Sequence, residues 1–420
     1  MELVTAAIFV VVLIAIVLDW IDRTKLALLG AAVMVLVGGI AVEPAIHAID
    51  WATLGLLLGM MILIALSQRT GIFGWVGIHA ARLSRGRPLR LLLLIGGLTA
   101  LLSAFLDNLT AILLVLPIAF TVARILRMSP LPLVITQIVA SNIGGTATLI
   151  GDPPNIMIAG HRPELGFVDF IVHLAPPAII ALAVALALLR VMFRRDLRFD
   201  RAHAATIASL DPSAELHGSR GRRVASILVL IGTLLAFLAH GPLGLAPVVV
   251  ALCGATAMLL VADVDMEHAL DGVEWPTLLF FIGLFVMIGA LEQQGVISAV
   301  ASAVEPLTAG SPTREAMVVI WAAALGSALV DNIPFTAAML PVVDQIQGPE
   351  LKPYLWWSLA LGACFGGNAT LVAAAANVAA SGIAKREGHT ISFTRFLLHG
   401  LPIALASLVI ATGWTVFVLL

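Results

Sequence analysis

Long apolar runs separated by short polar breaks recur along almost the whole chain. Residues 3–18, "LVTAAIFVVVLIAIVL", contain no charged side chain, and a helix needs about 20 apolar residues to cross a hydrocarbon layer of roughly 30 Å. This run lacks the basic start and the cleavage site of a signal peptide, so we expect a retained helix. The spanning helices are expected at 3–19, 25–43, 51–71 and 172–193, and again at 224–240, 246–263, 275–293 and 398–420.

Two further apolar runs carry an aspartate and an asparagine in their middle. These are "SAFLDNLTAILLVLP" (103–117) and "SALVDNIPFTAAMLP" (327–341). A polar pair between two apolar arms predicts a re-entrant helical hairpin that turns at the pair. The hairpins are placed at 88–126 and 312–347, with tips at Asp107, Asn108, Asp331 and Asn332; an amphipathic stretch near 72–86 precedes the first.

Two other segments predict helices that are broken in the middle, "SNIGGTATLIGDPPN" (141–155) and "GACFGGNATLVAAAAN" (362–377). Paired glycines weaken a helix, and the Pro-Pro pair of the first segment removes two backbone donors. The second segment has three alanines where the first has Asp-Pro-Pro, so we expect its break to depend on glycine alone. The broken helices are placed at 131–160 and 354–384.

The chain also reads as an internal duplication. "WATLGLLLGMMILIALSQRTG" (51–71) aligns without gaps to "WPTLLFFIGLFVMIGALEQQG" (275–295), and the same offset of 224 pairs the two Asp-Asn tips. The register then slips by two, so that the two broken segments match each other. Rare Trp, Asp, Asn and His residues coincide, which chance similarity between apolar helices does not produce. The expected units are a first repeat at 1–193, a polar linker at 194–223 and a second repeat at 224–420.

Composition excludes a water-soluble domain. Of the 420 residues, 60% are hydrophobic and 11% are charged, the mean hydropathy is +1.07, and soluble domains carry about 25% charged residues. No basic patch with interleaved aromatic residues supports nucleic-acid binding. The two cysteines form neither a disulfide framework nor a metal-ligand spacing, so no metal or cofactor is expected. The sequence therefore predicts an all-α polytopic membrane protein.

The distribution of basic residues indicates the topology. If each hairpin enters and leaves on one side, each half crosses the membrane an odd number of times, and the two repeats are inverted relative to each other. All of the 23 Lys and Arg residues then fall on one side except Arg162, Arg314 and Lys352. The positive-inside rule assigns that side to the cytoplasm. We therefore expect a multi-pass protein of the plasma (inner) membrane with cytoplasmic basic loops and a cytoplasmic 194–223 linker.

Inverted repeats with interrupted helices are typical of alternating-access transporters, whose site lies where the interruptions meet. A carboxylate at this depth is costly and marks an ion or proton route, so Asp107 and Asp331 are the candidates for proton coupling. The alternative is that each merely caps the following helix. His173, His399 and Cys364 are interpreted as packing residues rather than as a proton relay or a metalloid ligand.

The segments "SAFLDNLTAILLVLP" and "SNIGGTATLIGDPPNIMIAG" resemble the ArsB/NhaD group of the ion transporter superfamily, whose members share a citrate-transporter-like domain. Within that group the likeness is to the bacterial relatives of the melanosomal P protein. The resemblance implies a scaffold, a moving domain, an elevator mechanism and a homodimer. It implies substrate- and ion-binding positions at Asp107, Asn108, Ser141, Asn142, Gly144, Gly145, Thr146, Thr148, Asp152, Asn155, Asp331, Asn332, Gly366, Gly367, Asn368, Thr370 and Asn377.

These observations predict a secondary active transporter that exports a small inorganic solute. The solute is either Na⁺ or the oxyacids arsenite and antimonite, and the coupling ion is H⁺ or Na⁺, with H⁺ favoured. The neutral oxyacid is favoured by the absence of Lys and Arg from the motifs; an arsenite carrier would also imply an ATPase partner subunit. A citrate or dicarboxylate carrier is the alternative, although the dicarboxylate branch carries Ser-Asn-Thr at its hairpin tips. An intramembrane aspartyl protease that uses Asp107 and Asp331 is a remote alternative, and a passive channel is more plausible than the protease.

Overall fold

The computed structural model describes residues 1–18, 21–197, 206–207, 209–262, 264–308 and 310–420, and within these ranges the chain is helical and contains no strand. The helices of the first half are α1 (Glu2–Val17), α2 (Arg23–Leu36), α3 (Val42–His47), α4 (Trp51–Gln68), α5 (Ile72–Leu83), α6 (Pro88–Ser103), α7 (Asn108–Ile125), α8 (Leu131–Gly145), α9 (Pro153–His161) and α10 (Phe167–Met192).

The second half repeats this order after a short 3₁₀ turn, η1 (Pro212–Glu215). Its helices are α12 (Arg220–Leu243), α13 (Pro247–Ala262), α14 (Met266–Leu270), α15 (Trp275–Gln293), α16 (Val296–Thr308), α17 (Pro312–Leu329), α18 (Asn332–Gln347), α19 (Pro353–Gly366), α20 (Ala375–Arg386) and α21 (Phe393–Trp414), which continues as a π-helical turn (Thr415–Leu419). The expected fold class, two inverted repeats that each contain a helical hairpin and a broken helix, is confirmed.

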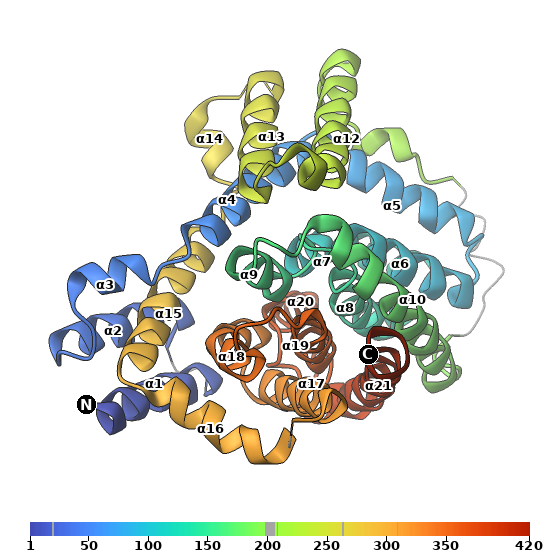
Figure 1. Cartoon of the computed structure of the whole chain (residues 1–420). Coiled ribbons are helices and arrows are strands. Elements are labelled where there is room, and N and C mark those ends of the chain that lie inside the picture. The colour runs from blue at the N-terminus through green and yellow to red at the C-terminus, as the bar shows by residue number, and fades with distance from the viewer. Residues whose placement is uncertain (19–20, 198–205, 208, 263, 309) are drawn as a thin grey trace.

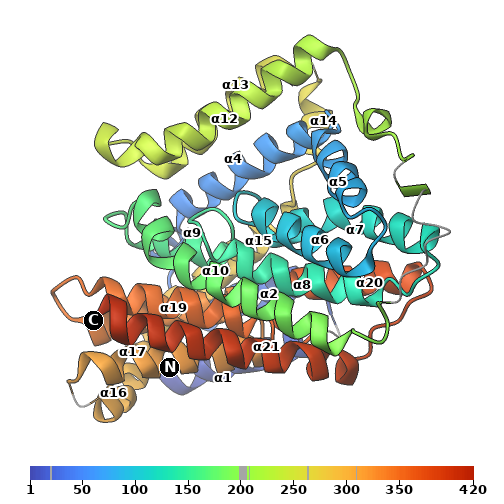
Figure 2. The same ribbon diagram turned by 90° about the vertical axis from the view of Figure 1, so that its right-hand side faces the viewer.

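The helices form two groups, which Figure 1 and Figure 2 show from two directions. A peripheral group combines α1–α4 with α12–α15: α4 packs on α13, and α15 packs on α2, so each contact joins one half of the chain to the other. A central bundle combines α6–α10 with α17–α21, in which α6 packs on α8, α17 on α19 and α10 on α21. The helices α5 and α16 connect the two groups in each half.

Six helices of the described chain are long and apolar enough to cross a membrane, namely α4, α7, α10, α12, α15 and α21 with its continuation. Large apolar side chains on the outer faces of α10, α12 and α21 are exposed, among them Ile179, Leu228 and Val409. An apolar exposed surface of this kind is suited to contact with lipid. The protein is therefore an integral membrane protein. The expected division at 194–223 stays a prediction, and residues 198–205 and 208 of that linker lie outside the described residues.

Several helix ends differ from the sequence expectation. α2 ends at Leu36 rather than near 43, because Gly38 adopts a left-handed conformation (φ +76°) and the next amide, that of Gly39, returns to the Met34 carbonyl at 2.8 Å. α10 begins at Phe167 rather than at 172, because the Asp169 carboxylate accepts a hydrogen bond from the Gly166 amide at 2.8 Å. The short helices α3 and α14, which precede α4 and α15, were not predicted.

Close helix contacts in the peripheral group depend on a pair of glycines related by the duplication. Gly59 of α4 lies against the backbone of Ala251 in α13, and Gly283 of α15 lies against the backbone of Ala27 in α2. A Cβ atom at Gly283 would lie 2.6 Å from the Ala27 carbonyl carbon. Because backbone cannot rotate away as a side chain can, a larger residue at Gly283 must separate the two helices.

We therefore expect Gly283→Leu to lower the melting temperature of the detergent-solubilised protein, since overpacking of this kind costs about 1–3 kcal/mol. Gly232→Leu is the matched control, because Gly232 is exposed on α12 and a Cβ atom there would meet open space. Equal melting temperatures for the two variants would contradict the close contact.

Candidate functional site

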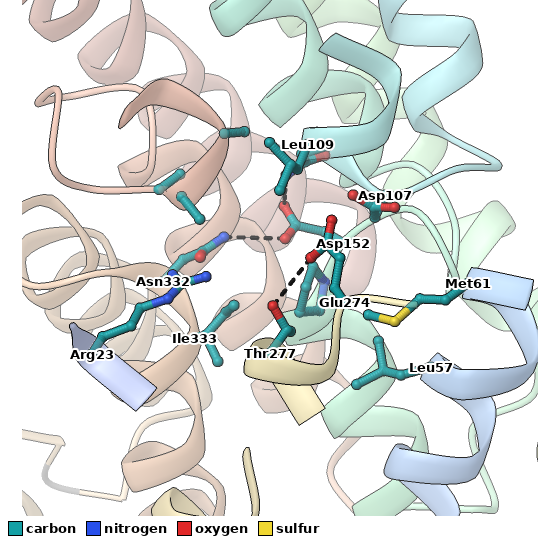
Figure 3. Close-up of a pocket in the computed structure, with 15 residues that line it drawn as sticks. Arg23, Leu57, Met61, Asp107, Leu109, Asp152, Glu274, Thr277, Asn332 and Ile333 are labelled. Atoms are coloured by element: carbon teal, nitrogen blue, oxygen red, sulfur yellow. Dashed lines mark hydrogen bonds between the residues drawn. The ribbon is translucent and has the colours of Figure 1, made fainter. Parts of the chain in front are cut away.

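The interruptions of the helices meet inside the central bundle. α6 and α7 are separated at Asp107, and α17 and α18 at Asp331, while the broken helices leave gaps between α8 and α9 and between α19 and α20. Figure 3 shows residues from both hairpin tips and from the first broken helix around one pocket. The structure thus brings together the interruptions that the sequence predicted.

Each hairpin is hydrogen-bonded to the broken helix of its own repeat. Ser103 Oγ donates to the Ser141 carbonyl at 2.8 Å, and the equivalent Ser327 Oγ donates to the Ala363 carbonyl at 2.7 Å. Further along, the Thr148 hydroxyl bonds the Ala104 carbonyl, and Thr370 Oγ1 donates to the Ala328 carbonyl at 2.7 Å. Hairpin and broken helix therefore form one structural unit in each repeat.

Two asparagines satisfy the free carbonyls at the breaks. Asn155 Nδ2 donates to the carbonyls of Thr146 (3.1 Å) and Thr148 (2.8 Å), and Asn377 Nδ2 donates to those of Gly367 (2.8 Å) and Thr370 (3.0 Å). Buried carbonyls require such partners. The second break contains no proline, as expected, and the Asn377 amide holds the carbonyls that this break leaves free, as Asn155 does at the first.

The remaining predicted residues of the broken helices serve backbone packing and the contact between repeats. Ser141 Oγ and Thr146 Oγ1 donate to carbonyls within their own helix. Asn142 Nδ2 crosses to the second repeat and donates to Asn368 Oδ1 at 2.9 Å and to Asn377 Oδ1 at 3.0 Å. The glycines of this set permit close approach: Gly144 and Gly366 lie against the Ala100 and Ala324 backbones, and Gly145 lies against the Asn108 side chain.

Asp152 is the point at which both hairpin tips converge. Its Oδ2 atom accepts from Asn108 Nδ2 at 2.9 Å, and its Oδ1 atom accepts from Asn332 Nδ2 at 3.1 Å, while the side chain is fully buried. The two asparagines occupy equivalent positions of the duplication, but the residue equivalent to Asp152 is Ala374, so one carboxylate holds both tips (Figure 3).

The two hairpin-tip aspartates cap helices and also line cavities. Asp107 Oδ1 accepts from the Thr110 amide at 2.8 Å, and Asp331 Oδ1 accepts from the Ile333 amide at 2.9 Å. The capping interpretation is therefore correct as a structural role. Asp107 and Asp152 face a small pocket of about 50 Å³, and Asp331 faces an adjoining cavity of about 600 Å³. Arg23, Leu109 and Ala375 line both spaces.

The sequence analysis missed two residues that the peripheral group contributes. The Arg23 guanidinium lies 3.4 Å from Asp331 Oδ2, and Glu274 lines the small pocket beside Asp107, with its Oε2 atom accepting from Thr277 Oγ1 at 3.1 Å. The argument for a neutral solute from the absence of basic residues is therefore weakened, because a cation does face the site. The duplication offered a signal for Glu274, since an acid precedes each of the paired residues Trp51 and Trp275.

The site carries a surplus of negative charge. Five carboxylates, of Asp22, Asp107, Asp152, Glu274 and Asp331, line the two spaces against the two basic side chains of Arg23 and Lys385. In the described part of the chain, no three His, Cys, Asp or Glu side chains gather as ligands of a metal ion. The available chemistry is therefore protonation of carboxylates and binding of a small cation by carboxylate and amide oxygens.

The 600 Å³ cavity extends from the second hairpin tip towards Lys385 in the last turn of α20.

The two groups of helices also meet away from this cavity, where Gly160 near the end of α9 packs against Asp50 and Thr53 of the peripheral group. Nearby, Asp344 forms ion pairs with His161 and Arg162. Asp344, which the sequence places near the outer end of its helix, is therefore ion-paired and not merely solvated.

The residues interpreted as packing are packed. The His173 ring stacks on Trp357 with ring centroids 4.9 Å apart, and the His399 ring stacks on Phe193 at 4.6 Å. Cys364 is buried, with its Sγ atom 3.9 Å from Asn155 Oδ1. These contacts agree with the packing interpretation and place the three side chains outside the cavity lining.

The chain is similar to known proteins both in sequence and in fold. A family model described as "Citrate transporter" (CitMHS) matches residues 13–362. An uncharacterized transporter of Mycobacterium tuberculosis is 38% identical over 98% of this chain and 97% of its own. The human P protein is 32% identical over 96% of this chain and 58% of its own. The YdaH transporter structure from Alcanivorax borkumensis matches 94% of this chain and 96% of its own with a TM-score of 0.58 at 17% identity, which is a likeness of fold.

Proposed function

The chain belongs to the citrate transporter (CitMHS) family, and on this premise we propose that it is a proton-coupled secondary transporter that exports a small inorganic solute, with Na⁺ as the leading candidate. It is a membrane transporter and not an enzyme, so the intramembrane protease considered above is wrong. The observation that carries the proposal is the surplus of carboxylates around the site, five against the two basic side chains of Arg23 and Lys385. Such a surplus attracts protons and small cations and disfavours an anionic substrate.

Asp152 is proposed as the residue that binds the exchanged cation or proton, with Asp107 and Asp331 as the coupling residues predicted from the sequence. Asp152 is fully buried and accepts hydrogen bonds from the tips of both hairpins. A change of its charge would therefore alter the contact between the two repeats. This arrangement supports a site where loading and conformational change are linked.

An elevator motion is proposed for the transport step, with the central bundle carrying the site past the peripheral group. The side chains that the peripheral group presents to the small pocket are few: Arg23, Leu57, Met61, Glu274 and Thr277. The larger cavity extends towards Lys385, which the topology predicted from the sequence places on the side of the basic loops. By the positive-inside rule this end is cytoplasmic, so the proposed state of this structure is open to the cytoplasm.

A second candidate is transport of citrate or another carboxylate. Two observations favour it: the description of the matching family model, and the Arg23 guanidinium in the cavity. Guanidinium groups bind carboxylates in bidentate geometry. Arg23 is already paired with Asp331, however, so a carboxylate substrate would have to compete with an internal carboxylate.

The test is flux into and out of vesicles that contain the purified protein, with Na⁺, arsenite and citrate measured side by side. We expect an inwardly directed proton gradient to drive saturable Na⁺ efflux, and a protonophore to abolish it. Proton-driven flux of citrate alone would favour the second candidate. Flux that neither saturates nor responds to the gradient would identify a passive channel and contradict the proposal.

A further inference from the structure

Arg23 is anchored in the peripheral group by contacts other than its ion pair with Asp331. It is the first residue of α2, whose N-terminus is capped by Asp22, and the adjacent Thr24 Oγ1 donates to the Pro276 carbonyl of α15 at 3.0 Å. Its guanidinium lies over the Phe280 ring, 5.4 Å from the ring centroid. A cation that is stacked and anchored in this way has a fixed position relative to α15.

The partner of Arg23 belongs to the other group of helices. Asp331 is the tip of the second hairpin in the central bundle, and its side chain is only 10% exposed in the ion pair with Arg23. One carboxylate oxygen caps α18, which leaves the other for Arg23. The ion pair therefore connects the peripheral group to the central bundle at the site.

The duplication repeats the acidic member of this ion pair but not the basic member. Asp331 is equivalent to Asp107, but Arg23 is equivalent to Pro247, the first residue of α13. Inverted repeats exchange their conformations between the two end states of a carrier. The opposite state would therefore bring Asp107 towards an uncharged proline, and no equivalent ion pair would form there.

We propose that Arg23 is a positioning residue that locks the unloaded carrier in the state seen here, and that a cation or proton arriving at Asp331 must displace it before the bundle moves. The inference rests on the proposed function. Other charges near the pair are Asp22 and Lys385 in the same cavity and Asp107, Asp152 and Glu274 in the adjoining pocket. The lock prevents movement of an empty carrier, and so it enforces exchange in place of leak.

The locking step can be measured without transport. We choose Ser381→Cys as a reporter, because Ser381 lines the cavity near Lys385, in a background where the exposed Cys253 is replaced by serine. In Na⁺-free detergent solution, maleimide should label this cysteine rapidly in the otherwise unchanged protein. Arg23→Gln should shift the equilibrium between accessible and inaccessible forms about tenfold towards the inaccessible form, the size expected for loss of a charge-assisted hydrogen bond.

Two variants separate locking from other effects of the substitution. Arg23→Lys keeps the charge and should restore most of the labelling, and Lys25→Gln removes an exposed charge of the same turn and should leave labelling unchanged. In vesicles, Arg23→Gln should release Na⁺ without a counter-ion, whereas the parent protein should require exchange.

The outcomes distinguish this inference from the proposed function. Labelling that is the same in Arg23→Gln and in the parent, or that falls equally in Lys25→Gln, overturns the lock even if Na⁺ flux is normal. A selective shift in labelling together with an absence of Na⁺ flux in every variant supports the lock and contradicts Na⁺ transport.

Discussion

Replacing Asp152 with asparagine should reduce proton-driven Na⁺ efflux from vesicles to the background of protein-free vesicles. The carboxylate is fully buried, and its two oxygens accept from the amides of Asn108 and Asn332. Asparagine has one acceptor oxygen, whereas the amides of Asn108 and Asn332 are two donors. One of these amides therefore loses its hydrogen-bond partner or faces the NH₂ group of the new asparagine. The variant thus removes the charge and weakens the link between the hairpin tips, at a cost of about 1–3 kcal/mol of folding stability.

Because of that cost, the Asp152→Asn protein must be shown to be folded by its elution profile and melting temperature before flux is compared. Ala374→Ser is the matched control, since it places a small polar group at the equivalent position of the other repeat. We expect this control to retain flux. Gradient-driven flux at half the parent rate or more in a folded Asp152→Asn protein would contradict the central role of Asp152.

Asp107→Asn is expected to uncouple transport from the proton gradient while leaving the protein folded. The hydrogen bond of Asp107 is the helix cap to the Thr110 amide at 2.8 Å, and asparagine caps helices about as well as aspartate does. The substitution therefore removes the titratable charge and keeps the cap. The measurement is Na⁺ flux in vesicles with and without an imposed pH gradient.

Asp107→Ala completes this experiment, because it removes both the charge and the cap. If Asp107 only caps α7, Asp107→Asn should transport like the parent protein, and Asp107→Ala should lose stability, typically about 1 kcal/mol for a lost cap. Coupling by the carboxylate predicts instead that both variants lose their response to the gradient. The same pair of substitutions at Asp331 tests the other hairpin.

Much of the fold could be predicted because the bilayer restricts the alternatives. Apolar length indicates a spanning helix, and the coincidence of rare residues such as Trp51 and Trp275 indicates the duplication. The hairpin tips and both breaks lie where the pattern placed them. Helix ends were less accurate, as at Gly38, because an end depends on a local backbone conformation that hydrophobicity does not encode.

The site was only partly predictable. The polar residues inside apolar runs were found, since a polar group in lipid is conspicuous, but Arg23 and Glu274 lie at helix ends, where charged residues are common. The role of Asn377 was missed for a different reason. Its contact with the carbonyls of Gly367 and Thr370 depends on how the break folds back on itself.

The sequence by itself determined an integral membrane protein with two related halves and with polar interruptions inside its apolar runs, because the cost of burying polar groups in lipid is visible in the order of residues. The tertiary structure alone decided which of these groups meet: that Asn108 and Asn332 share Asp152, and that Arg23 pairs with Asp331 from 308 positions away. The physical reason is that two of these contacts, Asn332–Asp152 and Arg23–Asp331, join one repeat to the other, while Asn108–Asp152 depends on how the first broken helix packs on its hairpin. Tertiary packing of this kind leaves no periodic signal along the chain.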